Sequence, residues 1–302
     1  LEVLATATNF TLALGPTNGP NTYASTLVTS GSIRALNPGG ISPGPLTVDL
    51  IGVVHVFGNN VTVASLNNGI NGGGPIYNMS TTSNGTLTVG TDNTSTSFDG
   101  VFGDGASKAL GLTKVGTGTL TLSGVSTNTG DVTVNGGTLA LIGSGSFNNA
   151  SNLVVATGAT LDVTGRTDAT LTLAPNQTLR HGGNSTGPIT IAGNLNLGGG
   201  ILSLAINRSG LAHDSLAVSG STTISGTLAV TNIGAALQVG DSFQLFPAAT
   251  PGFSAFSLPA NDVANNVIYT WNNTISSNGK ITVVSVTPMV NPNPPTILTS
   301  LS

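Results

Sequence analysis

A four-residue apolar alternation recurs through the middle of the chain. The second and fourth positions of each tetrad are Leu, Val or Ile, the third is usually Thr, Ala, Asp, Asn or Ser, and turn-forming residues separate the tetrads. Because side chains alternate across a strand, each tetrad presents two apolar groups on one face. One such face is too small to be stable alone, so the pattern favours many short strands stacked over one core. The tetrads are TLTV (86–89), TLTL (119–122), DVTV (131–134), TLAL (138–141), NLVV (152–155), TLDV (160–163), TLTL (170–173), PITI (188–191), NLNL (194–197), ILSL (201–204), SLAV (215–218) and TLAV (227–230).

The spacing of the tetrads indicates coils. Tetrads that begin at 131, 152, 170 and 188 are 21, 18 and 18 residues apart, and those at 119, 138 and 160 are 19 and 22 apart. A period near twenty with two or three short strands fits one turn of a parallel β-helix, whose coils lie ~4.8 Å apart. We therefore predict an all-β fold with a parallel β-helix (β-solenoid) over 51–258, in which residues 50–235 would form about nine coils at this period. A β-sandwich is the alternative, and it should show turn signals every ~8–12 residues without a longer period.

Composition excludes several classes of protein. Charged residues make up only 6% of the chain, with a net charge of −4, and no helical apolar stripe is present, so we expect almost no helix. Seven scattered basic residues cannot neutralise a run of phosphates, which argues against a nucleic-acid partner. No apolar run approaches the ~20 residues of a membrane span. The absence of cysteine rules out disulfides and Cys-based metal sites.

The histidines form no recognisable catalytic motif. His55 alternates with two valines in an expected strand, which favours a partly buried structural role. His213 precedes Asp214 but has no third partner at a recognisable spacing, and nothing like a nucleophile elbow is present around any serine. His181 stands alone. We therefore predict no hydrolytic triad.

Polysaccharide lyases and hydrolases are the serious enzyme alternative, because they also use β-helices. They need clustered carboxylates, often with Ca²⁺ and a basic residue. Asp131, Asp162 and Asp168 do not share a coil-spaced column, and no carboxylate pair stands beside Arg166 or Arg180. The segment DGVFGDG (99–105), with Asp99 and Asp104, hints at calcium but lacks the alternating acidic positions of a calcium loop. We predict a Gly-rich corner there, and no catalytic residue, metal or cofactor.

Residues 97–143 resemble the autotransporter-associated β-strand repeat of bacterial surface proteins. The most specific pieces are LTKVGTGTLTLSG (112–124) and VNGGTLAL (134–141). The similarity extends over about 84–258, through HDSLAVSGSTTISGTLAV (213–230) and GDSFQLF (240–246). The resemblance implies a right-handed parallel β-helix, export and surface display, and no catalytic residue. The glycines at the positions expected of the repeat are Gly116, Gly118, Gly124, Gly136 and Gly137.

The two ends differ from the middle. Residues 1–50 are expected to form an extended strand followed by a Pro/Gly-rich linker at 37–46. Residues 259–287 are expected to form a hairpin cap about an Asn278-Gly279 turn, and 288–302 a Pro-rich tail with a short apolar end. Since a solenoid exposes strand edges at both ends, such strands could complete the sheet of a neighbouring copy. The apolar residues proposed for this pairing are Leu1, Val3, Leu4, Phe10, Leu12, Leu14, Ile297, Leu298 and Leu301.

The function expected from the sequence is passive. We predict a non-catalytic structural protein, secreted or on the outer cell surface, that assembles head to tail into a fibre. Because the chain begins at Leu1 without Met or an apolar leader, we expect a mature or excerpted chain that lacks its signal peptide. A monomeric adhesin that binds surface glycans or other cells is the alternative. The opposing interpretation of the ends is that the N-terminal strand caps its own solenoid and the tail is a solvated linker.

Overall fold

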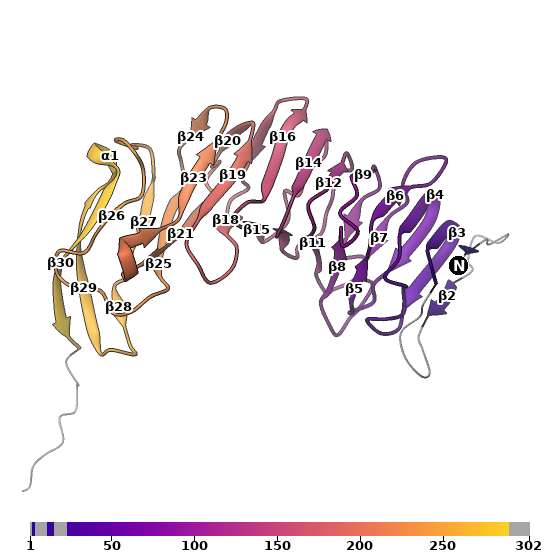
Figure 1. Ribbon diagram of the computed structural model, residues 1–302, viewed down its shortest axis with the longest axis horizontal. Coiled ribbons are helices and arrows are strands. Elements are labelled where there is room, and N and C mark those ends of the chain that lie inside the picture. Colours follow the sequence, from indigo (N-terminus) through magenta and orange to yellow (C-terminus); the bar gives the residue numbers. More distant parts are fainter. Residues whose placement is uncertain (1, 4–10, 15–22, 290–302) are drawn as a thin grey trace, which may run out of the picture.

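The computed structural model describes residues 2–3, 11–14 and 23–289 of the 302-residue chain. Half of the residues are in strands and 3% are in helix, and the strands stack into a β-solenoid of about ten turns. The solenoid is a gently curved rod with a separate antiparallel layer at its C-terminal end (Figure 1). The predicted all-β solenoid is confirmed, and the β-sandwich is wrong because neighbouring strands along the rod run parallel. No helix in the described part of the chain has the length and apolar character needed to cross a membrane.

The solenoid has three sides, of which side 1 carries the longest sheet. Its strands pair in parallel from the N-terminal part of the rod to its C-terminal end. A short strand, β22 (Ala212–His213), pairs antiparallel with one of them. The strands of side 1 are β5 (Asn60–Val63), β8 (Gly85–Val89), β11 (Leu110–Lys114), β13 (Val132–Val134), β15 (Asn152–Val155), β18 (Thr178–His181), β21 (Ile201–Asn207), β25 (Thr227–Asn232) and β27 (Ala255–Ser257).

Sides 2 and 3 share two long strands near the N-terminus. β3 (Thr26–Ala35) and β4 (Leu46–His55) each bend from side 2 to side 3, so that one strand serves both sides. The other strands of side 2 are β1 (Glu2–Val3), β6 (Leu66–Asn68), β9 (Thr96–Phe98), β12 (Thr119–Leu122), β14 (Thr138–Gly143), β16 (Thr160–Arg166), β19 (Pro188–Ala192) and β23 (Ser215–Val218). The other strands of side 3 are β2 (Thr11–Leu14), β7 (Ile76–Tyr77), β10 (Phe102–Gly103), β17 (Thr170–Thr172), β20 (Asn194–Asn196) and β24 (Thr222–Thr223).

The register confirms one predicted column and corrects the other. The tetrads at 119, 138 and 160 stack on side 2, with Leu120 beside Leu139 and Leu139 beside Leu161. The tetrads at 131 and 152 pair on side 1, but the next strand there is β18 at 178, not the tetrad at 170. The tetrad at 170 lies on side 3 and the one at 188 on side 2. Because tetrads of all three sides look alike, spacing alone could not assign them to a side.

The coil stack begins earlier than residue 51. That expected boundary falls inside β4, which pairs in parallel with β3 over most of its length. The Pro/Gly-rich segment between them is a coil corner, closed by a 2.9 Å hydrogen bond from the Gly40 N–H to the Asn37 carbonyl. Ile41 in this corner is 1% exposed. The segment is therefore part of the solenoid, because a corner needs the same turn residues as a linker.

The core is a set of apolar lanes inside the rod. On side 2, the second and fourth tetrad residues of successive strands are almost fully buried from β12 to β19. Full burial of one Leu, Val or Ile side chain contributes about 1.5–3 kcal/mol. Each coil therefore adds only a small apolar face, and the stability of the rod comes from stacking.

The C-terminal cap is an antiparallel sheet of order β26-β30-β29-β28. The expected hairpin forms, but its connection is five residues long, since Thr274 pairs with Lys280. A helical turn precedes Gly279, whose φ of +77° ends it, so the predicted Asn-Gly pair is not a two-residue turn. The elements of the cap are β26 (Ser242–Gln244), β28 (Asn261–Asp262), β29 (Val267–Thr274), α1 (Ile275–Asn278) and β30 (Lys280–Pro288).

Candidate functional site

Two buried polar side chains meet between sides 1 and 2. His181 and Asp214 are 3% and 2% exposed, and the His181 Nδ1 atom lies 3.6 Å from Asp214 Oδ1. The Asp214 carboxylate accepts hydrogen bonds from the Gly187 and Ala205 N–H groups at 2.9 and 2.6 Å. Burial raises the pKa of Asp214, while these hydrogen bonds act in the opposite direction. The carboxylate thus links the residue before β19 to the interior of β21.

The opposite ring nitrogen of His181 gives the cluster a triad-like outline. His181 Nε2 lies 2.9 Å from the Thr157 hydroxyl, so hydroxyl, imidazole and carboxylate stand in a row. However, Gly187 packs so closely on Thr157 that a Cβ at that position would lie 2.1 Å from the hydroxyl oxygen. Thr157 itself is exposed, whereas His181 and Asp214 are buried. The row therefore links a surface hydroxyl to a buried carboxylate.

The sequence did not predict this cluster. The sequence places Asp214 beside His213, but the His213 Nδ1 atom lies 2.8 Å from the Asp214 backbone carbonyl oxygen. His181 is 33 positions before Asp214, and nothing in that spacing marks the pair. His55 lies at the end of β4, where it is partly buried as predicted, and burial followed by the charge of Arg34 lowers its pKa.

The two carboxylates of the Gly-rich corner at 99–105 accept hydrogen bonds from other residues of the chain. Asp99 accepts a hydrogen bond from the Gly73 N–H. Asp104 accepts from the Leu110 N–H at 2.8 Å and from both the N–H and the hydroxyl of Thr129 at 3.0 and 2.8 Å. Within the described ranges, no three His, Cys, Asp or Glu side chains are placed to hold a metal ion. The corner interpretation of this segment fits these contacts.

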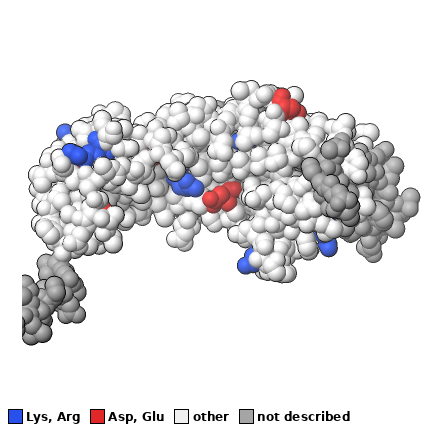
Figure 2. Space-filling view, turned by 60° about the horizontal axis from the view of Figure 1, so that its bottom comes forward, with Lys and Arg blue, Asp and Glu red and all other residues white. Residues whose placement is uncertain are grey.

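The remaining carboxylates considered for a lyase site are dispersed. Asp162 accepts from the N–H and hydroxyl of Thr164, and Asp168 pairs with Arg166 at 3.1 Å, which lowers the pKa of Asp168. Asp131 accepts from Asn152 at 2.6 Å and lies 3.8 Å from Arg180. Charged side chains are isolated spots on the largely uncharged face in Figure 2. None of these groups forms the paired carboxylates of a glycosidase.

The five repeat glycines have a geometric role. A Cβ on Gly118, Gly124 or Gly137 would lie 2.2–2.3 Å from a carbonyl oxygen of the preceding coil, and one on Gly116 would lie 2.0 Å from the Gly90 oxygen. At Gly136 the nearest atom would be 3.1 Å away. Gly116 and Gly137 also have positive φ values of +69° and +59°. Coil corners can therefore stack in contact only because these positions carry no side chain.

Lys114 is the unusual residue of the repeat. It is 1% exposed, and it stands in register with Val89 and Val134 of the neighbouring strands. Its ammonium donates to the carbonyls of Val115, Gly116 and Gly136 at 2.6, 3.1 and 3.3 Å. Burial lowers the pKa of this lysine. The ammonium thus satisfies carbonyls of two adjacent glycine corners, a role that the sequence did not reveal.

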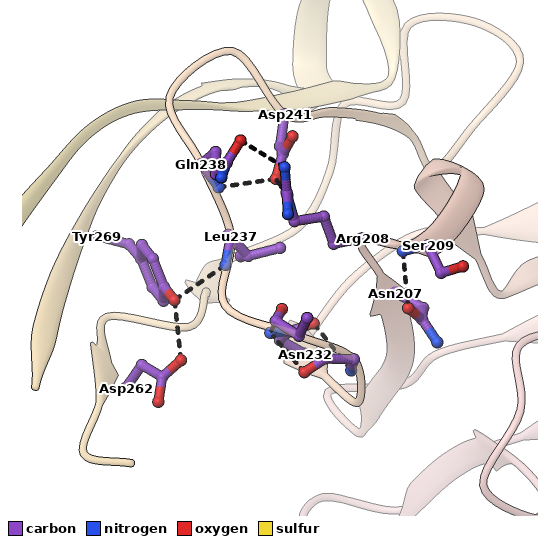
Figure 3. Close-up of polar contacts among 11 residues, drawn as sticks. Asn207, Arg208, Ser209, Asn232, Leu237, Gln238, Asp241, Asp262 and Tyr269 are labelled. Carbon is purple, nitrogen blue, oxygen red and sulfur yellow. Dashed lines mark hydrogen bonds and ion pairs between the residues drawn. The ribbon is translucent and has the colours of Figure 1, made fainter. Parts of the chain in front are cut away.

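Polar contacts fasten the cap to the last coils (Figure 3). The Tyr269 hydroxyl accepts from the Leu237 N–H at 3.0 Å and donates to Asp262 at 2.9 Å. Burial raises the pKa of Tyr269, and hydrogen bonds from Asn265 and then Tyr269 lower the pKa of Asp262. Arg208, which follows β21, pairs with Asp241 at 3.1 Å. The cap is therefore held by hydrogen bonds as well as by apolar packing.

Aromatic and amide residues singled out in the sequence are structural. Tyr269 is 4% exposed, and Trp271 packs against the core while its indole donates to the Pro259 carbonyl at 2.6 Å. The Asn194 side chain accepts from Ser221 of the next coil, and that of Asn196 accepts from the Gly198 N–H in the glycine bend 198–200. The core and turn interpretations are thus favoured over a sugar-contact patch.

The described strand-donor residues lie at the N-terminal end of the rod. Val3 is in β1 and pairs with Val28, while Leu12 and Leu14 are in β2 and pair with Ile33 and Ala35. Both strands therefore add to the edge of β3 in the same chain. The other proposed residues lie outside the described ranges: Leu1, Leu4, Phe10, Ile297, Leu298 and Leu301.

Comparison with known proteins identifies the repeat. Residues 112–141 match the family model of the passenger-associated-transport repeat. The matched segment runs from β11 through β12 and β13 into β14, and it includes Lys114 and the glycine corners. No curated protein matches the chain.

Proposed function

We propose that the chain, whose residues 112–141 match the passenger-associated-transport repeat and whose fold is a β-solenoid, is a passive passenger-type rod that joins other copies end to end. Passenger repeats imply a secreted or surface-exposed protein, and the solenoid gives it the character of a structural domain. The observation that carries the proposal is the unbroken stack of about ten coils. Such a stack gives the rod a fixed length and two unlike ends.

The polar groups of the rod support a structural role. The buried Lys114, His181 and Asp214 are each engaged by groups of other coils or loops. Asp104 is likewise saturated by backbone and hydroxyl donors. Groups held in this way stabilise the stack, because an unpaired buried polar group costs about 1–3 kcal/mol.

The ends of the rod support self-association. At the N-terminal end β1 and β2 pair only with β3, and at the other end β23 and β24 are the last strands of sides 2 and 3 among the described elements. Strand edges of this kind accept further strands. Contacts between unlike ends of identical chains do not close, so they build filaments.

Electron microscopy of concentrated, purified protein tests the proposal, together with light scattering at increasing concentration. We expect filaments whose axial repeat matches one subunit, about 50 Å for ten coils at the ~4.8 Å strand spacing. Single dispersed rods and a constant monomer mass at every concentration would overturn self-association.

Deletion of residues 1–15 or of 288–302 tests the role of the termini. Each deletion should shorten or abolish filaments, while circular dichroism should show the retained β signal of the solenoid. If filaments form equally well without either segment, terminal strands do not make the contact.

A monomeric glycan-binding adhesin is the second candidate, favoured by a polar cleft on side 1. The cleft has a volume of about 450 Å³, and its walls carry hydroxyl, amide and carboxylate groups that suit neutral sugars. Its polar lining residues are Asn84, Thr86, Thr113, Thr129, Asp131, Thr133 and Ser151. Binding of the wild-type protein to arrayed glycans, lost in Thr113→Val and Thr133→Val variants, would support it. If the wild-type protein binds no arrayed glycan, the adhesin candidate is excluded.

A further inference from the structure

One coil in the middle of the rod is shorter than the coil that follows it. On side 1, Val132 pairs with Leu153, 21 positions later, whereas Leu153 pairs with Leu179, 26 positions later. The longer coil places β17 on side 3. The shorter coil passes from β14 to β15 through residues 144–151, all of which the structure describes, and forms no strand there. β17 therefore has no strand beside it on the side of the shorter coil, and it is an end strand of its sheet among the described elements.

The backbone of β17 directs polar groups toward the place of the missing strand. On its other edge, the Leu173 N–H donates to the Asn196 carbonyl of β20 at 2.9 Å. The Ala169 carbonyl, just before β17, accepts from the Asn194 N–H at 2.9 Å. Because the backbone groups of successive residues in a strand point to opposite edges, the N–H and carbonyl of Thr172 face the shorter coil. Neither group bonds to another coil in the part of the chain that the structure describes, so both are free to bind a molecule in the gap.

The gap between the two coils is closed at both of its ends. Before β17, the Thr167 N–H donates to the Gly143 carbonyl of the shorter coil at 3.0 Å. After β17, the Gln177 side chain donates to the carbonyls of Phe147 and Ala150 at 2.8 and 2.9 Å. A further strand would hold the two coils about 9.4–9.8 Å apart, which is twice the strand spacing. The gap therefore admits a compact molecule and not a polypeptide strand.

An apolar cavity of about 320 Å³ lies at this gap. Its volume is at the lower end of the range of small-molecule sites, about 300–1,000 Å³. The amide of Gln177, which reaches the interior, is fully engaged, because it also accepts from the Ala174 N–H at 3.2 Å. The interior is otherwise apolar, so the body of a ligand must be apolar as well. The apolar lining residues come from all three sides, are at most 7% exposed, and are Val132, Leu141, Phe147, Leu153, Leu161, Leu171 and Leu173.

The polar groups that line the cavity determine which head group a ligand can carry. Ser146 is 5% exposed, and its hydroxyl makes no hydrogen bond among the described residues, whereas its N–H donates to the Gly124 carbonyl at 3.3 Å. A buried hydroxyl without a partner is costly, and a ligand that supplies one removes this cost. Arg166 pairs with Asp168 at 3.1 Å and also donates to the Gly145 carbonyl. The lining thus offers a charged ligand no unpaired charge of opposite sign, so the ligand that fits is uncharged.

We infer that this cavity binds a small uncharged molecule with an aliphatic body and one hydrogen-bonding group, such as a primary alcohol. The aliphatic body lies among the leucines of the three sides. The polar group exchanges hydrogen bonds with the Ser146 hydroxyl and the Thr172 backbone. This binding site goes beyond the proposed function and does not depend on self-association, because each rod contains the whole cavity.

Titration of the purified protein with 1-butanol, 1-pentanol and 1-hexanol, followed by the methyl NMR signals of its leucines and valines, tests the inference. The signals of Leu153, Leu161 and Leu171 should shift, and the affinity should rise about fourfold with each added methylene until the cavity is full. Hexanoate and hexylamine should bind about tenfold more weakly than 1-hexanol, because their charges find no free partner. The inference is overturned if 1-hexanol shifts none of these signals up to its solubility limit. It is equally overturned if either charged compound binds as tightly as 1-hexanol.

A variant that fills the cavity locates the bound molecule. Leu171→Phe should abolish 1-hexanol binding without lowering the urea midpoint, because filling a cavity usually stabilises a fold. The matched control is Leu216→Phe, since Leu216 is partly buried and lines a different cleft, and its binding should equal that of the wild type. Wild-type affinity in Leu171→Phe, or an equal loss in the control, would overturn the assigned site. If Leu171→Phe does not fold, the wild-type titration decides.

The outcome is separate from that of the proposed function. If 1-hexanol binds but no filaments form at any concentration, self-association fails and the cavity site stands. If filaments form but no alcohol binds, the proposed function stands and this inference is wrong.

Discussion

At the scale of single residues, the solenoid depends on missing side chains. Along one corner, a Cβ on Gly74, Gly100 or Gly124 would lie 2.0–2.3 Å from the carbonyl oxygen of the preceding corner glycine. A real Cβ cannot occupy such a position, so the backbone would have to move. These glycines therefore set how closely successive coils approach at the corner.

Replacing Gly124 by Ala should destabilise the solenoid by about 1–3 kcal/mol, the usual cost of overpacking. Its Cβ would lie 2.3 Å from the Gly100 carbonyl oxygen, whereas the Cβ of Gly136→Ala would lie 3.1 Å from its nearest atom. Gly136→Ala should therefore change the free energy of unfolding by less than about 1 kcal/mol. Urea unfolding of both variants checks this. If the two variants are equally stable, contact at the corner does not limit how closely successive coils approach.

His55 should make stability depend on pH. Burial, and then the charge of Arg34, lower its pKa below 6.5 in the folded state. As pH falls below 6.5, the unfolded chain is protonated first, so folded-state stability is full above pH 6.5 and is lost as pH falls toward the folded pKa. A His55→Gln variant should lack this component of the slope. Unfolding free energies measured from pH 8 to pH 5 check it, and an unchanged slope in the variant would contradict it.

At the scale of elements, one hydroxyl joins three segments at the C-terminal cap. The Leu237 N–H is satisfied by the Tyr269 hydroxyl at 3.0 Å, and Leu237 is 2% exposed. The same hydroxyl donates to Asp262 on β28. The segment before β26 and two strands of the cap are thereby joined at one point (Figure 3).

Tyr269→Phe should loosen the cap. It leaves the buried Leu237 N–H without its acceptor, which costs about 1–3 kcal/mol. Tyr77→Phe is the matched control, since no hydrogen bond of the Tyr77 hydroxyl occurs among the described residues. Hydrogen exchange should quicken in β29 and β30 of the first variant alone. Unchanged protection there would mean that apolar packing alone holds the cap.

At the scale of the whole molecule, electrostatics contribute little. Only 18 of 302 residues are charged. The ion pairs of the described residues are few, and those of Arg166 and Arg180 involve partners that are half-exposed. Such exposed pairs are worth about 0–1 kcal/mol and are screened by salt.

Stability should therefore be nearly independent of salt. Raising NaCl from 0.1 to 1 M shortens the screening length from about 10 to about 3 Å. We expect the melting temperature to shift by less than about 4 °C, which corresponds to about 1 kcal/mol in a protein of this size class. Scanning calorimetry checks this. A larger loss of stability with salt would reveal charge interactions that the described contacts do not contain.

The sequence by itself determined the solenoid. Tetrads with two apolar positions and intervening turn residues can be stable only when many are stacked. This alternation recurs along the chain, so the sequence alone predicts the stacking. The glycines of 112–141 likewise indicated stacked corners, because a backbone that lies against the neighbouring coil leaves no room for a side chain.

The tertiary structure decided everything that depends on which coil lies beside which. The tetrads at 170 and 188 lie on sides 3 and 2, not in the column that their spacing predicted, because the three sides share one side-chain pattern. The pairing of His181 with Asp214 and of Lys114 with the glycine corners joins residues through stacking. No sequence spacing encodes these contacts, since coil length varies from turn to turn. That β23 and β24 are the last strands of their sheets among the described residues likewise appears only in the tertiary structure.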